Sequence, residues 1–399
     1  MRFAGLCLAA LLALTAAAPF DSAKAADEVV IKTAILTVKY RKERPISRLD
    51  LPPRDLGVAG ARQALEDNNS TGRFLGQVYE MAEASAKPDK AAAKLDELIA
   101  DGATFIAINA NADDLLALAD HVEGQDVLLV NVAATDNRLR NDDCRINVVH
   151  AAPSRAQITD GLAQYMVWKK WREWFLIHGS NPEDLLKAES YRRSAKKFGL
   201  KITEERVFED TGGARRSDSG HVLVQKQIPV FTNRADDHDV VVAADEAGVF
   251  GVYLPYRLND PRPVVGDAGL IASMWHPGHE SWGATQLQRR FERKQKRQMR
   301  DVDYNAWIGL RTIGEAVTRA ETKDFAGVKS YLLSQDLEIA GFKGIPLNYR
   351  PWNNQLRHGV ILGDGKLVVT VSPQDEFLHQ HTRLDTLGFD EPESSCSFN

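Results

Sequence analysis

The sequence is poor in cysteine and carries no strong excess of charge of either sign. Only 3 of its 399 residues are cysteine, which excludes a small scaffold held together by disulfides. Fifty Lys and Arg residues against 55 Asp and Glu give a formal net charge of −5. A nucleic-acid-binding protein is therefore not expected, because such proteins carry a basic excess. With 44% hydrophobic residues, the chain is long and apolar enough for two folded domains.

The common signatures of catalysis are also missing. The sequence contains no GxSxG, P-loop or HExxH pattern, and no cysteine placed with a histidine and an acid. The dinucleotide-binding pattern GxGxxG is absent as well. We therefore predict that the protein is not an enzyme and holds no cofactor.

One long apolar run stands at the start of the chain. It covers residues 3–18, follows Arg2, and is succeeded by Ala23-Lys24-Ala25. Small residues at the −3 and −1 positions are what a signal peptidase accepts, so residues 1–25 are predicted to be a signal peptide cleaved after Ala25. No later stretch approaches 18 apolar residues. The mature protein is thus expected to be soluble and exported to the periplasm.

Export would place the cysteines that remain after signal cleavage in an oxidising compartment. Cys7 lies inside the predicted signal, which leaves Cys144 and Cys396. Two cysteines in an oxidising compartment favour a disulfide between them. The alternative is one buried thiol and one free thiol in the C-terminal tail.

From residue 29 onward, short β-branched runs alternate with longer helical patterns, and the alternation starts again near residue 146. Strands are predicted at 29–36, 104–109, 127–132, 146–150, 174–178, 201–208, 240–244 and 263–266, and helices at 57–69, 88–100, 113–121, 154–170, 183–198, 284–300, 303–320 and 324–334. A hairpin is predicted around Gly363-Asp364-Gly365, and residues 211–218 read as a loop. Strand–helix alternation predicts an α/β fold with two parallel-sheet lobes and a cleft between them.

Polar side chains follow several of these strands and are candidates for binding a ligand. They are Asn111, Thr135, Asp136, Glu246 and Asp267. In open parallel sheets, ligands bind where the loops at the carboxyl ends of strands converge. The competing explanation is local: Asp267 caps the next segment, and Thr135 and Asp136 form a turn.

Acidic and histidine-containing segments raise the alternative of a metal-ion capture protein. Asp236-Asp237-His238-Asp239 places four candidate ligands side by side, but neighbours in an extended segment point to opposite sides. His276 and His279 are separated by Pro277-Gly278, which opposes a zinc-binding helix. A solvated loop is the simpler interpretation of both segments, and no metal site is predicted.

The order of strands and loops resembles a known family. The segments that carry the resemblance are 29–36, 57–69, 106–111, 130–135, 150–154, 240–246, 265–269 and Pro346-Leu347-Asn348-Tyr349. Together they are similar to the type I periplasmic solute-binding proteins of ABC importers, the branched-chain amino acid-binding class. Residues 67–76 and 282–288 look like a subgroup that accompanies pyrroloquinoline-quinone (PQQ)-dependent alcohol dehydrogenase systems.

The resemblance implies two lobes joined by three crossovers, closure on a small-molecule ligand, and docking to an ABC permease in the inner membrane. It places lobe 1 at residues 28–149 and 273–335, and lobe 2 at 150–272 and 336–399. A periplasmic dehydrogenase system is a further implied partner. An accessory or sensor protein of the same fold, serving alcohol oxidation without feeding a permease, is the alternative function.

The chain departs from the amino acid-binding members at the ligand site. The loop Asn109-Ala110-Asn111 has no Ser or Thr, although Thr135 matches a family hydroxyl. Asp267, supported by Glu246, matches the acid that family members offer to the ammonium group of the substrate. An α-amino acid ligand is therefore not expected. The seven Arg or Lys residues within 289–300 form either a solvated face or a docking face for a permease or an acidic partner.

Overall fold

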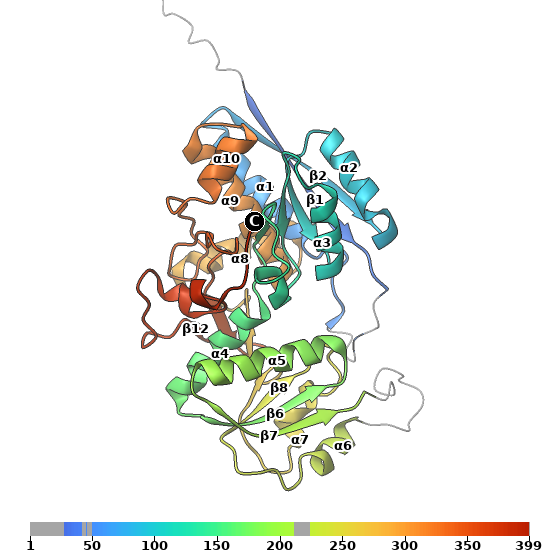
Figure 1. Ribbon diagram of the computed structural model, residues 1–399, viewed down its shortest axis with the longest axis vertical. Helices are drawn as coiled ribbons and strands as arrows, with labels where there is room; N and C mark the ends of the chain where they lie inside the picture. The colour runs from blue at the N-terminus through green and yellow to red at the C-terminus, as the bar shows by residue number, and fades with distance from the viewer. Residues whose placement is uncertain (1–27, 42–44, 46–49, 211–223, 399) are drawn as a thin grey trace, which may run out of the picture.

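A computed structural model describes residues 28–41, 45, 50–210 and 224–398. The chain forms two bodies, each built on its own sheet (Figure 1). The predicted signal peptide, residues 1–25, and the predicted loop at 211–218 lie outside the described residues. Within the described part of the chain, no helix is both long and apolar enough to span a membrane.

The first body contains a five-stranded parallel sheet in the order β2-β1-β3-β4-β5. Its strands are β1 (Val29–Val38), β2 (Gln77–Ala86), β3 (Phe105–Asn109), β4 (Leu128–Asn131) and β5 (Val148–His150). Successive residues of β1 point to opposite faces: Ile35 packs into one apolar cluster and Leu36 into another. One cluster contains α1 (Val58–Gly72), and the other contains α2 (Ala91–Ala100) and α3 (Ala112–His121).

The second body contains a seven-stranded sheet in the order β12-β11-β10-β9-β8-β6-β7. Its strands are β6 (Glu173–Gly179), β7 (Lys201–Phe208), β8 (Val240–Ala244), β9 (Val264–Gly266), β10 (Leu270–Ser273), β11 (Val360–Gly363) and β12 (Val368–Ser372). The β11–β12 hairpin is antiparallel, and the other described pairings are parallel except that between β10 and β11. Helices α4 (Arg155–Lys169) and α5 (Pro182–Lys197) cover one face, while α6 (Val224–Phe231) and α7 (Leu254–Arg257) cover the other.

The chain passes between the bodies more than once. After β5 it enters the second body, and after β10 it returns to the first through α8 (Ala284–Gln295), α9 (Asp301–Ala320) and α10 (Phe325–Leu332). These helices share the apolar cluster of α1, and Figure 1 shows α9 and α10 beside α1 in the first body. After α10 the chain enters the second sheet again as β11 and β12. The lobe boundaries given above remain a prediction.

The predicted α/β class with two mostly parallel sheets is confirmed. Four α-helices or strands were not predicted: β2, β10, α6 and α7. The predicted end of the first helix at residue 69 is wrong, because α1 continues to Gly72. The helix predicted at 284–300 stops at Gln295, since Lys296 adopts a left-handed backbone conformation with φ 59°.

Cys144 and Cys396 form a disulfide in this structure. Cys144 lies between β4 and β5 of the first body, and Cys396 lies near the end of the C-terminal tail. The bond therefore fastens the tail to the first body.

Candidate functional site

A cavity of about 700 Å³ lies between the two bodies. The first body lines it with the ends of β1 and β3, the residue Ala133 after β4, and the segment before α1. The second body contributes Glu246, which follows β8, and Glu183, which lies in the first turn of α5. The strands therefore direct their carboxyl ends toward this space, as expected for ligand sites in parallel α/β sheets.

The end of β1 supplies a hydroxyl group without a hydrogen-bond partner. The Oγ1 atom of Thr37 is buried and forms no hydrogen bond within the described part of the chain. Thr37 lines the cavity beside Tyr40, whose phenol donates to Asp114 and accepts from the backbone N–H of Asn111. Burial and the nearby carboxylates raise the pKa of Tyr40, so its phenol stays protonated at neutral pH.

Asn111 also lines the cavity, but its side chain already has a structural task. Its oxygen accepts the backbone N–H of Asp114 at 2.8 Å and so caps the N-terminus of α3. Asp113 and Asp114 lie in the first helical turn. Only the remaining polar atoms of Asn111 are available to a ligand.

Arg155, the first residue of α4, joins the two bodies behind the cavity. Its guanidinium donates two bonds of 2.8 Å to the two oxygens of Glu246 and one of 2.9 Å to Asp136. Its backbone N–H donates to the carbonyl of Thr135 at 2.8 Å. Burial opposes the charge of Arg155, but the Glu246 and Asp136 carboxylates outweigh it and keep its pKa above the ordinary value.

Lys187 on α5 forms a similar ion pair with Asp267, within the second body. Its ammonium donates to one oxygen of Asp267 at 3.1 Å, while the other oxygen accepts the backbone N–H of Asp245 at 2.8 Å. The lysine is 6% exposed. Burial disfavours its charge, yet Asp267 and Glu246 raise its pKa overall, so Lys187 is a buried ammonium group.

The structure thus divides the five predicted residues. Asn111 and Glu246 line the cavity, whereas Thr135, Asp136 and Asp267 do not. Asp136 and Glu246 meet at Arg155, and Asp267 meets Lys187. Their assignment as ligand contacts remains a prediction.

Sequence reasoning missed the two cations, Arg155 and Lys187. Arg155 directly follows the helix-starting Pro153-Ser154, at the point where the chain enters the second body. That position could have identified it as a residue facing the loops of both bodies. Lys187 carries no comparable signal, because a lysine in the second turn of a helix is ordinarily solvated.

Other charged groups in the cavity have no such partners within the part of the chain that the structure describes. Lys39 and Arg54 line its first-body wall, and both are exposed. Neither forms an ion pair with any described residue, and the same holds for the half-exposed Glu183 opposite. Among the described residues, the first body therefore offers a ligand two cations without an ion-pair partner, and the second body offers one such carboxylate.

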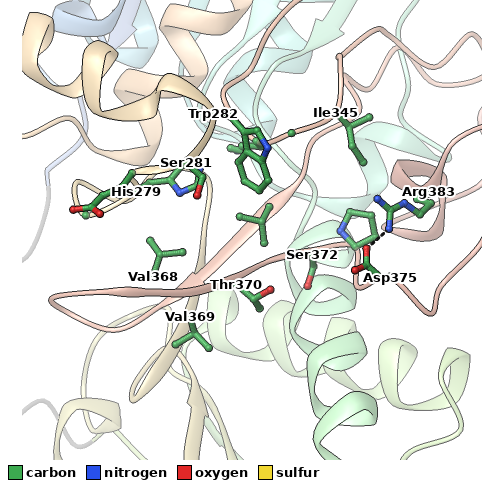
Figure 2. Close-up of a pocket in the computed structure, with 16 residues that line it drawn as sticks. His279, Ser281, Trp282, Ile345, Val368, Val369, Thr370, Ser372, Asp375 and Arg383 are labelled. Carbon is green, nitrogen blue, oxygen red and sulfur yellow. Dashed lines mark hydrogen bonds and ion pairs between the residues drawn. The ribbon is translucent and has the colours of Figure 1, made fainter.

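A second cavity, of about 620 Å³, lies along β12 and contains none of the predicted residues. Figure 2 shows Trp282 on one side of this strand and the Arg383–Asp375 ion pair near the strand's end. Trp282 is 56% exposed and has φ 52°. Its indole rests against Gly344, where a Cβ atom would come within 2.9 Å of the ring. This cavity shares no lining residue with the cavity of about 700 Å³.

The two candidate metal segments are held by ordinary hydrogen bonds. Asp239 accepts the backbone N–H groups of Arg172 and Glu173, and His238 bonds through Nδ1 to a backbone carbonyl. His279 bonds through Nε2 to the carbonyl of Phe342. Across the described ranges, no three His, Cys, Asp or Glu side chains gather to hold a metal ion.

Comparison with known proteins places this geometry in a family. A family model described as "Periplasmic binding protein" matches residues 55–366. No curated protein sequence matches the chain.

Solved structures share the fold at low sequence identity. A branched-chain amino acid ABC transporter ligand-binding protein from Burkholderia xenovorans is similar with a TM-score of 0.70 and 16% identity, covering 92% of this chain and 99% of its own. A leucine-, isoleucine-, valine-, threonine- and alanine-binding protein from Brucella ovis gives 0.69 and 15%, with coverages of 92% and 98%. An R. palustris solute-binding protein in complex with benzoate gives 0.62 and 11%, with coverages of 92% and 99%. These similarities show the fold.

Proposed function

The chain belongs to the periplasmic binding protein family, and from this we propose that it captures a small organic solute in the cavity between its two bodies for an ABC importer. The observation that carries the proposal is the cavity of about 700 Å³, lined from both bodies at the carboxyl ends of their strands. A ligand that contacts both walls stabilises the closed arrangement over the open one, which is the basis of hinge closure. A permease can then distinguish loaded from empty protein.

A ligand-stability screen with one obstructed variant tests this proposal. The full chain is expressed with export, purified from the periplasm, and heated with organic acids, amino acids, alcohols, aldehydes and quinones. A ligand at one hundred times its Kd adds about 2.7 kcal/mol to the free energy of unfolding and raises Tm by a few degrees. Ala133→Trp places an indole in the cavity, and we expect it to abolish the shift.

Ala93→Trp is the matched control, because Ala93 is exposed on α2 and lies outside the cavity. It should leave the ligand-induced shift intact. A shift that survives in Ala133→Trp would contradict binding in this cavity. Small-angle scattering of the same samples should show a smaller radius of gyration when the solute is bound.

Export is tested on the same preparation. The family is periplasmic, and we propose that the chain reaches that compartment through a signal peptide of residues 1–25. N-terminal sequencing of the purified protein is expected to begin at Ala26. An intact Met1 would contradict cleavage.

The narrower proposal of a link to PQQ-dependent alcohol oxidation rests on residues 67–76 and 282–288 of the sequence. Within such a system, the protein either delivers its solute to a permease or acts as an accessory or sensor protein. Co-purification after crosslinking separates these roles: an ABC permease supports import, whereas a dehydrogenase or sensor kinase supports the accessory role. Recovery of neither partner class would count against both roles.

A further inference from the structure

We propose that Lys187 and Arg155 are built-in counter-ions that make the cavity selective for organic anions without an ammonium group. This inference rests on the proposed function, because it names the class of solute that the cavity takes. The first observation that supports it is that the carboxylates Glu246 and Asp267 of the second body already have hydrogen-bond partners. Both oxygens of Glu246 accept hydrogen bonds from Arg155. One oxygen of Asp267 accepts from Lys187, and the other accepts from the backbone N–H of Asp245.

The burial of the two cations stabilises their ion pairs with the carboxylates. The side chains of Arg155 and Lys187 are 7% and 8% exposed, whereas those of Asp136, Asp267 and Glu246 are 20–31% exposed. The cations thus lie behind the carboxylates, inside the protein. A ligand ammonium that approached Glu246 or Asp267 would compete with a buried cation, and displacing that cation would leave its charge unpaired.

The opposite wall of the cavity favours a negative group. Lys39 and Arg54 are exposed there, and neither has an ion-pair partner among the described residues. The unpartnered hydroxyl of Thr37 lies on the same wall. A carboxylate placed against this wall gains charge-assisted hydrogen bonds, while the rest of the ligand faces the second body without an ammonium group.

Glu183 is the group that could reverse this preference. It lines the cavity from α5, and no ion pair engages it within the described residues. It is half-exposed, so water already solvates its carboxylate and a ligand ammonium would gain little from it. If Glu183 nevertheless bound an ammonium group, Glu183→Gln would lower the affinity for the ammonium-bearing ligand and leave the affinity for its amine-free partner unchanged.

Matched ligand pairs give the test. 4-Methylpentanoate and L-leucine differ by one ammonium group, as do 3-phenylpropanoate and L-phenylalanine, and benzoate adds a rigid acid. We expect calorimetric affinities at least about tenfold tighter, and larger thermal shifts, for the amine-free member of each pair, because the described cavity wall offers the ammonium no free buried acceptor. Amino acids that bind as tightly as their amine-free partners would overturn the inference.

Variants assign the selectivity to the cations. Lys187→Met frees Asp267 and removes a cation that also interacts with Glu246 at the cavity wall, so it is expected to narrow the difference between the affinities for L-leucine and 4-methylpentanoate. Since removal of one partner of a buried pair can unfold a protein, Lys187→Met/Asp267→Leu replaces both by apolar groups. This double variant should fold, bind the amine-free acid and still reject the amino acid. Retained affinity for the acid in Lys39→Gln/Arg54→Gln would contradict the anion-binding wall.

Lys170→Gln/Arg257→Gln changes the net charge equally at exposed positions outside the cavity and should not affect binding. Failure of this inference is distinguishable from failure of the proposed function. A neutral or amino-bearing solute whose shift disappears in Ala133→Trp would overturn the anion preference and leave solute capture standing. No shift with any neutral, anionic or amino-bearing solute at millimolar concentration would overturn both.

Discussion

Thr37 presents a buried hydroxyl group that no described residue satisfies. Unpaired buried polar groups are rare in native proteins, and one at the wall of a cavity suggests a bond that forms only with the ligand. Thr37→Val keeps the shape of the side chain and removes the hydroxyl. We expect Tm without ligand to stay level or rise, while ligand affinity falls by about tenfold, the loss of one hydrogen bond.

Thr159 is the matched control for this change. Its hydroxyl is buried and bonded to the Arg155 carbonyl and to Ser194. Thr159→Val should therefore lower the free energy of unfolding by about 1–3 kcal/mol, since its partners lose a bond in the interior. Equal stability losses in the two variants would show that the Thr37 hydroxyl is satisfied by the protein itself.

Lys343 is a buried ammonium group of a different kind, because no carboxylate of the described residues bonds to it. Its Nζ donates to the carbonyl of Gly359 at 3.0 Å and lies 4.3 Å from the centre of the Tyr304 ring. Burial lowers the pKa of Lys343 to about 7, and Asp301 offsets this only in part. The folded state therefore releases this proton more easily than the unfolded chain does.

The direction of the pH effect follows from this difference. Between pH 7 and pH 10.5 the unfolded chain holds a proton that the folded protein has lost, so the free energy of unfolding rises with pH across that window. Each pH unit there contributes up to about 1.4 kcal/mol. Lys343→Met removes the titration. Urea unfolding should show it to be more stable relative to wild type at pH 7 than at pH 9.

Lys366→Met serves as the control, since Lys366 is exposed in the β11–β12 turn. Its stability difference from wild type should not vary with pH. A Lys343→Met difference that is constant from pH 7 to pH 9 would mean that Lys343 titrates alike in the folded and unfolded states.

Individual site residues were only partly predictable from the sequence. The position of a strand end is encoded locally, and it directed attention to the loops around Asn111 and Glu246, which line the cavity. The partner of a side chain is not encoded locally. Arg155 and Glu246 are 91 residues apart, and Lys187 and Asp267 are 80 apart. Their pairing depends on how β6, β8, β9 and the helices assemble.

At the scale of elements, the contact between α1 and α9 depends on close backbone approach. A Cβ atom on Gly60 would lie 1.8 Å from the carbonyl oxygen of Asp303. The same contact is held by a bond of 2.8 Å from the N–H of Gly57 to the Asp303 carboxylate. The two helices therefore cannot separate to admit a side chain without breaking this bond.

Gly60→Ala is expected to destabilise the first body. Alanine in a helix interior favours folding by up to about 1 kcal/mol over glycine. Overpacking against a backbone atom costs about 1–3 kcal/mol or more, so the clash prevails. Urea unfolding should show a net loss, whereas Gly365→Ala, with no atom within 4 Å of its Cβ position, should show none. A stabilised Gly60→Ala would contradict the close approach of the two helices.

Buried central strands were predictable, whereas the edge strand β2, the short strand β10 and the helices α6 and α7 were not. Strands β3, β4 and β8 are almost wholly buried, and they are apolar apart from the final residues of β3 and β4, Asn109 and Asn131, which gives them a clear signal. Strand β2 lies at the edge of its sheet, so polar residues such as Glu80 and Glu83 interrupt its apolar pattern. Helix α6 carries Pro229 in its interior, which opposes a helix assignment.

At the scale of the whole molecule, the C-terminal tail contacts both bodies. The N–H of Gly388 donates to buried Asp160 on α4, and Glu393 accepts from Lys197 on α5. Farther along, Ser394 donates to the carbonyl of Arg140. The disulfide then joins Cys396 to the first body. The tail is therefore a strap with one end on each body.

Opening this strap should lower the stability of the molecule as a whole. The disulfide closes a loop with a sequence separation of 252 residues, and removing such a bond costs about 2–5 kcal/mol. We expect Cys396→Ser, Cys144→Ser/Cys396→Ser and reduced wild type to unfold at the same lower urea concentration. Ser397→Ala, which changes the tail but keeps the disulfide, should match oxidised wild type. A single-cysteine variant as stable as oxidised wild type would mean that the ion pairs of the tail hold the bodies together without the disulfide.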